Sequence, residues 1–132
     1  MQIPTSRFLR LVLLADAATC LATGLLMILG STLLAQFLGM PPEMLRYAGI
    51  SLLPFTAFLV YLMSRERLSP ATVWTVIVVN VLWTIDSFLI LATGWIKPNQ
   101  LGFAFIGAQA LGVAMFAALE YVGLKKSAAG IF

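Results

Sequence analysis

Residues 71–92 read ATVWTVIVVNVLWTIDSFLILA, an apolar run in which Asp86 is the one charged side chain. The run is close in length to the ~20 residues that an α-helix needs to cross the hydrocarbon core of a bilayer. Three further apolar runs of similar length lie on either side of it, at residues 8–30, 45–63 and 101–124. The sequence therefore predicts four transmembrane helices in a single domain covering residues 1–132.

The connections between these runs combine proline or glycine with charged or amide side chains, at residues 39–43, 64–70 and 94–100. Such residues end helices and favour contact with water. Because the connections are short, consecutive helices should be antiparallel neighbours. We therefore expect an all-α fold, an up-down antiparallel four-helix bundle.

The composition supports a membrane location. Hydrophobic residues make up 61% of the chain and charged residues only 10%, whereas soluble domains carry about 25% charged residues. The net charge of +3 comes from basic residues scattered over the connections, without an aromatic RNA-binding motif. We expect membrane lipid as a partner and no nucleic acid.

The first run stays apolar as far as Leu38, which is longer than one crossing requires. It is either a tilted helix or a helix followed by a short amphipathic segment along the outer interface, over residues 31–39. Gly30 is a plausible break, which favours the second interpretation. A cleaved signal peptide is disfavoured because Asp16 interrupts the apolar region and hydrophobic residues continue after it.

The basic residues predict the orientation. With the N-terminus inside, six lie in cytoplasmic segments and two in outer connections, and cytoplasmic segments of membrane proteins are enriched in Lys and Arg. The inner group is Arg7, Arg10, Arg65, Arg67, Lys125 and Lys126, and the outer group is Arg46 and Lys97. The prediction is N-in and C-in, in a bacterial inner membrane.

Polar side chains inside the predicted spans are the candidate ligand-binding residues: Asp16, Asn80, Trp83, Asp86 and Gln109. Ionisable groups are costly in a bilayer and commonly mark functional sites. Asp16 lies nine residues after Arg7, hence about 13 Å along the helix. We hypothesise that Asp16 meets Asn80 or Gln109 and lines a polar pocket, and that Arg46 extends towards Asp86. The alternative is that these polar groups hold the bundle together by interhelical hydrogen bonds.

Other residues have structural interpretations. Glu120 is expected to form an interfacial ion pair with Arg10, Lys125 or Lys126, and Cys20 to pack as a small residue. Pro54 should kink the second span and free a carbonyl group. Small residues repeat every fourth position at Ala104, Ala108 and Gly112, a seam that permits close helix approach.

The residue types also exclude several chemistries. The chain has no histidine and one cysteine, which excludes bis-histidine haem, histidine-bound zinc, a Ser-His-Asp triad and an intramolecular disulfide. No catalytic, cofactor or metal motif is present. We expect a protein that is not an enzyme and that needs no cofactor.

Three segments suggest a family resemblance: Arg7-Phe8-Leu9-Arg10-Leu11 before an Ala/Gly-rich first span, Leu38-Gly39-Met40-Pro41, and residues 102–121. In these segments the chain resembles small bacterial four-span membrane proteins and, distantly, DoxX-like proteins. The resemblance implies the four-helix architecture and no site residues.

Two functions follow as expectations. The first is binding or transport of a lipid or lipophilic small molecule in a polar-lined cavity of the bundle. The alternative is a non-catalytic accessory or scaffold subunit of a homo-oligomer or a larger membrane complex.

Overall fold

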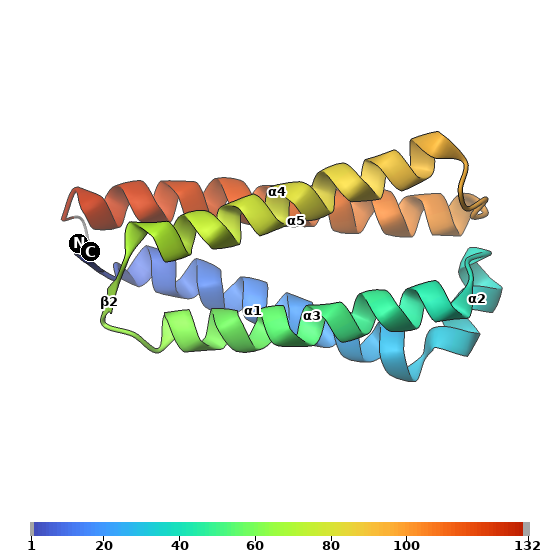
Figure 1. Ribbon diagram of the computed structural model, residues 1–132, viewed down its shortest axis with the longest axis horizontal. Helices are drawn as coiled ribbons and strands as arrows, with labels where there is room; N and C mark the ends of the chain where they lie inside the picture. The colour runs from blue at the N-terminus through green and yellow to red at the C-terminus, as the bar shows by residue number, and fades with distance from the viewer. Residues whose placement is uncertain (1, 131–132) are drawn as a thin grey trace.

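The computed structural model describes residues 2–130, which are mostly helical. Four long helices and one short helix account for most of the chain, and two short strands lie near one end (Figure 1). The elements in order are β1 (Ile3–Pro4), α1 (Arg7–Leu29), α2 (Ser31–Leu38), α3 (Pro42–Met63), β2 (Arg67–Leu68), α4 (Pro70–Thr93) and α5 (Gln100–Ala128).

Four of these helices, α1, α3, α4 and α5, are long and apolar enough to cross a membrane. This confirms the four apolar helices predicted from the sequence, each starting one to three residues earlier than expected. The chain breaks at Gly30 and continues as α2. The first apolar run is therefore a helix followed by a second, short helix, rather than one long helix.

Local sequence signals explain where the helices begin and end. The side chains of Ser6 and Asn99 accept hydrogen bonds from the backbone amides of Leu9 and Gly102, capping the first turns of α1 and α5. Gly39 and Gly94 end α2 and α4 at φ values of 68° and 72°, a backbone region that glycine adopts without strain.

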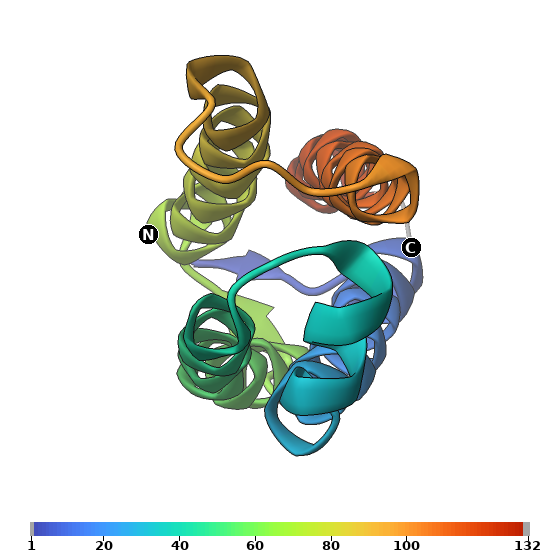
Figure 2. The ribbon, with the colours of Figure 1, turned by 90° about the vertical axis from the view of Figure 1, so that its right-hand side faces the viewer.

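The long helices alternate in direction, and the two chain ends lie at the same end of the molecule (Figure 1). Helix α1 packs closely on α3, α4 packs on α5, and α1 also contacts α5. Figure 2 shows α3 and α4 on one side of the molecule, and few contacts join these two helices. The expectation that all consecutive helices are close neighbours is therefore wrong for α3 and α4.

The pairing of α1 with α3 depends on a glycine contact. A Cβ atom added to Gly49 would lie 2.7 Å from the carbonyl oxygen of Gly24. Only glycine permits the two backbones to approach this closely, as in other small-residue contacts between membrane helices. Because Gly24 and Gly49 lie far apart in the sequence, their contact depends on the register of the two helices.

The strands close the bundle at the end that holds both termini. Ile3 pairs with Leu68 and Pro4 with Arg67 in an antiparallel ladder. The backbone amide of Ser6 donates to Ser127 Oγ at 3.0 Å, which joins the start of α1 to the last turn of α5. The sequence carries no signal for this ladder, because two-residue strands show no hydrophobic periodicity.

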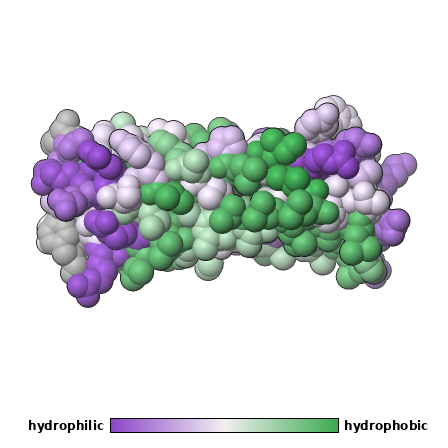
Figure 3. Space-filling model, turned by 90° about the horizontal axis from the view of Figure 1, so that it is seen from below, coloured by the Kyte–Doolittle hydropathy of each residue, from purple (hydrophilic) through white to green (hydrophobic). Residues whose placement is uncertain are grey.

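The molecular surface has an apolar belt. Figure 3 shows hydrophobic residues over the middle of one face and hydrophilic residues concentrated at the ends. Many large apolar side chains are exposed along all four long helices, among them Leu11, Leu25, Val60, Leu82 and Leu111. A surface of this kind is compatible with a multi-pass membrane protein.

Candidate functional site

A buried polar cluster joins α1, α4 and α5. The Nδ2 group of Asn80 donates to Asp16 Oδ2 at 2.9 Å and to Glu120 Oε1 at 2.7 Å. The three side chains are 3%, 1% and 0% exposed, respectively. Asp16 therefore meets Asn80, one of the two contacts proposed for it, and Glu120 joins them. We call Asp16 and Glu120 the carboxyl pair.

Glu120 faces the interior of the bundle and contacts Asn80 rather than a basic residue. Its Oε1 atom accepts from Asn80, whereas the basic residues expected to pair with it lie elsewhere. Arg10 donates to the carbonyl of Met63, and Lys125 and Lys126 lie over the rings of Tyr121 and Phe8. The prediction of an interfacial ion pair is therefore wrong. On α5 the Glu120 side chain faces Asn80, whereas the two lysines lie a few residues later in the helix. Its neighbours Ala117 and Gly123, both small and buried, are the sequence signal for an inward face.

The carboxyl pair has few hydrogen-bond donors. Asp16 Oδ1 accepts from the Cys20 thiol at 3.3 Å, and Glu120 Oε2 is buried without a partner. Since one amide nitrogen bonds both acids, they lie close together. Like charges repel in a low-dielectric interior, so a positive charge beside the pair would be favourable.

A second polar network connects α4 to α5. The indole Nε1 of Trp83 donates to Gln109 Oε1 at 2.7 Å, and Gln109 Nε2 donates to Ser87 Oγ at 2.9 Å. Ser87 in turn donates to the carbonyl of Trp83 at 2.8 Å. Gln109 is therefore bonded to Trp83 and Ser87 rather than to Asp16.

Replacing Gln109 by leucine removes the partner of the Trp83 indole and the donor to Ser87. We expect Gln109→Leu to lower the free energy of unfolding by about 1 kcal/mol, typical of interhelical hydrogen bonds in membranes. Chemical unfolding in detergent measures this change in the free energy of unfolding. Gln36→Leu, an exposed glutamine on α2, is the matched control and should leave stability unchanged. Equal stabilities of the two variants would contradict the network.

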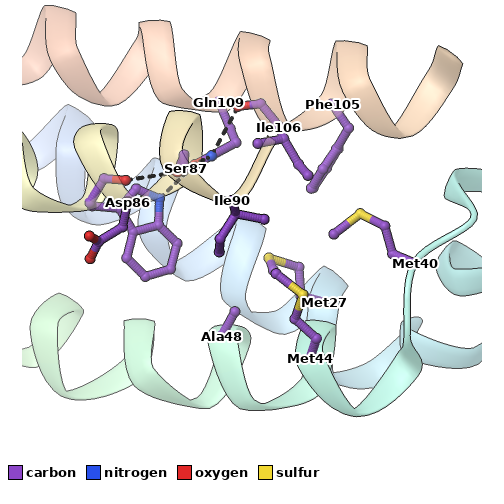
Figure 4. Close-up of a pocket in the computed structure, with 11 residues that line it drawn as sticks. Met27, Met40, Met44, Ala48, Asp86, Ser87, Ile90, Phe105, Ile106 and Gln109 are labelled. Carbon is purple, nitrogen blue, oxygen red and sulfur yellow. Dashed lines mark hydrogen bonds between the residues drawn. The ribbon is translucent and has the colours of Figure 1, made fainter. Parts of the chain in front are cut away.

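The first cavity lies between α3, α4 and α5 and has a volume of about 240 Å³. Its walls are mainly apolar, and Figure 4 shows Ile90 of α4 facing Met44 and Ala48 of α3. The polar network lies at one end, where Ser87 and Gln109 join the lining. The lining residues are Met27, Met40, Met44, Ala48, Trp83, Asp86, Ser87, Ile90, Phe105, Ile106 and Gln109.

The second cavity has a volume of about 180 Å³ and is bordered mainly by α1 and α5. Trp83 and Gln109 line both cavities, so their hydrogen bond lies at the wall between the two. The remaining lining combines four residues of one face of α1 with residues of α3 and α5: Asp16, Thr19, Cys20 and Thr23, with Leu52, Ala108, Gly112, Val113 and Phe116.

Asp86 and Arg46 do not meet. Asp86 is exposed and borders the first cavity. Arg46 instead donates to Ser31 Oγ at 3.3 Å, on the adjacent short helix α2. The hypothesis that Arg46 extends towards Asp86 is wrong, because α3 and α4 are separated and α2 offers a nearer acceptor.

The small-residue seam on α5 does not support helix packing within this chain. Ala104 and Ala108 are exposed, and a Cβ atom added to Gly112 would meet nothing within 4 Å. Ala108 and Gly112 instead border the second cavity. Pro54 lies inside α3, as expected, but is exposed and borders neither cavity.

Fold and site together describe an all-helical protein with four candidate membrane spans, a buried carboxyl pair and two cavities that share a tryptophan–glutamine wall. No protein family, curated protein or solved structure matches the chain. Within residues 2–130, no group of three or more His, Cys, Asp and Glu side chains is arranged to hold a metal ion.

Proposed function

We propose that the protein binds or transports a lipid or lipophilic small molecule, which it holds in the first cavity. The observation that carries this proposal is an apolar cavity of about 240 Å³ with hydrogen-bonding groups at one end. Ligand sites in proteins commonly combine a hydrophobic wall with a few oriented polar groups. Ser87, Gln109 and Asp86 provide those polar groups here.

The lining suggests what kind of molecule fits. Met27, Met40 and Met44 border the cavity, and methionine side chains are flexible enough to adapt to ligands of different shape. An apolar cavity of about 150 Å³ can hold benzene. The first cavity therefore has room for a substituted ring or a short stretch of acyl chain, with a small polar group directed at Ser87 or Gln109.

The position of the cavity supports entry from the lipid. It lies where α3 and α4 make few contacts, whereas α1 with α3 and α4 with α5 pack closely. A lipophilic molecule could reach this cavity sideways, between α3 and α4, without crossing water. Asp86 borders the entry and is exposed, so it is placed to contact a polar head group.

The proposed orientation is N-in and C-in, in a bacterial inner membrane. Six of the eight basic residues belong to the end that holds the termini, and cytoplasmic ends are enriched in such residues. Three of them lie over aromatic rings there: Arg65 over Tyr61, Lys125 over Tyr121 and Lys126 over Phe8. At the opposite end, Trp95 is 88% exposed, as expected for an interfacial aromatic residue.

Filling the first cavity should remove its ligand. We expect native mass spectrometry of the wild-type protein, gently extracted from its own membrane, to show a discrete bound small molecule. Ala48→Phe places a ring in the cavity and should abolish that mass. Ala57→Phe is the matched control, because Ala57 is an exposed alanine on the same helix, and it should keep the ligand.

An accessory or scaffold role is the second candidate. It is favoured by the seam of α5, where Ala104, Ala108 and Gly112 are not covered by another helix of this chain. The same mass spectrometry experiment separates the two functions. A defined oligomer or a co-purifying protein without any ligand mass would support the accessory role and contradict the cavity proposal. So would identical ligand masses in the two phenylalanine variants.

A further inference from the structure

The carboxyl pair lies beside the second cavity and has no cation of its own. Asp16 borders that cavity, whereas Glu120 does not line it and is linked to Asp16 through the shared Asn80 amide. Glu120 is fully buried, and its Oε2 atom has no hydrogen-bond partner. A buried acid that is partly unsatisfied in this way favours a proton or another positive charge nearby.

No basic side chain among residues 2–130 is placed to supply that charge. The titratable groups facing the pair are Asp16 and Cys20 on α1 and Glu120 on α5, while α4 presents the neutral Asn80. Helix α3 presents Leu52 and Thr56 at its buried face. The remaining charged groups of these helices are Arg7, Arg10, Glu43, Arg46, Asp86, Lys125 and Lys126, none of which borders the second cavity.

The other walls of the second cavity suit an organic cation. Trp83 and Phe116 contribute aromatic rings, and Thr19 and Thr23 contribute hydroxyl groups. Aromatic faces attract ammonium groups, most strongly where water is excluded. We propose that the second cavity binds an organic monocation, whose charge pairs with Asp16.

Such a cation would offset the charge of a buried acid with which no basic side chain pairs, a charge that is otherwise costly in a low-dielectric interior. This site is distinct from the first cavity, and the inference does not rest on the function proposed for that cavity.

The test uses the intact protein in detergent and a permanently charged probe, benzyltrimethylammonium. Equilibrium dialysis measures its binding, and neopentylbenzene serves as a neutral comparison compound of nearly the same shape. We expect the cation to bind at least tenfold more tightly than the neutral compound.

Single substitutions then show which acid pairs with the cation. Asp16→Asn should weaken binding of the cation at least tenfold and leave that of neopentylbenzene unchanged. Glu120→Gln leaves Asp16 in place at the cavity, so binding of the cation should persist. Glu43→Gln is the matched control, because Glu43 is an exposed acid on α3 that borders neither cavity, and this variant should bind the cation like the wild type.

The comparison of the two probes on wild-type protein needs no variant, so it decides the proposal even if Asp16→Asn fails to fold. Equal binding of the charged and neutral compounds would overturn the cation site. Loss of the first-cavity ligand in Ala48→Phe, with cation binding intact, would support two separate sites.

Discussion

Asn80→Leu should lower the free energy of unfolding by about 2 to 4 kcal/mol. The Asn80 amide is the donor that Asp16 and Glu120 share, at 2.9 Å and 2.7 Å. Its removal leaves two buried acids with fewer hydrogen bonds, and each unsatisfied buried group costs about 1–3 kcal/mol. Reversible unfolding in detergent, followed by circular dichroism, measures the change.

The control for this experiment lies on the same helix. Thr75 is exposed, and its hydroxyl donates only to the carbonyl of Ala71 within α4. Thr75→Val should therefore leave the stability within about 0.5 kcal/mol of the wild-type value. If Asn80→Leu proved as stable as Thr75→Val, the cluster would not contribute to holding α1, α4 and α5 together.

Gly49→Ala should destabilise the protein by about 1–3 kcal/mol. The added methyl group would lie 2.7 Å from the Gly24 carbonyl oxygen and 2.9 Å from Ile28 Cγ1. One of these neighbours is backbone, so the clash can be relieved only by separating α1 from α3. The same unfolding measurement tests the prediction, and the midpoint should shift without loss of helix content at low denaturant.

Gly107→Ala provides a matched glycine on α5, where an added Cβ would meet nothing within 4 Å. Alanine favours helix over glycine by up to about 1 kcal/mol, so this variant should be neutral or slightly stabilised. If both glycine variants changed stability equally, helix propensity rather than the close approach of α1 and α3 would explain the result.

The carboxyl pair holds helices together, and one of its members is also placed to contact a ligand. It joins three helices through Asn80, while its member Asp16 also borders the second cavity. Structural hydrogen bonding and ligand binding were alternatives for the intramembrane acids when only the sequence was considered. For Asp16 the two roles are compatible, because one oxygen accepts from Asn80 while the residue also borders the second cavity.

The sequence by itself determined the elements of this protein. Apolar runs of about 20 residues define the four candidate spans, and the Pro and Gly residues between them end the helices. The break after Gly30 could also be predicted, since glycine there precedes an amphipathic segment. The inward direction of Asp16 followed from helical periodicity, because a charged side chain in a membrane helix avoids lipid.

The tertiary structure decided which helices meet and at what register. Periodicity gives the polar face of each helix but not the neighbour that covers it, so the choice between Asn80 and Gln109 as the partner of Asp16 was open. Glu120 looked interfacial from its distance to the lysines, although the rotation of α5 buries it completely. The cavities, too, depend on the separation of α3 from α4, which arises from long-range packing that no local pattern encodes.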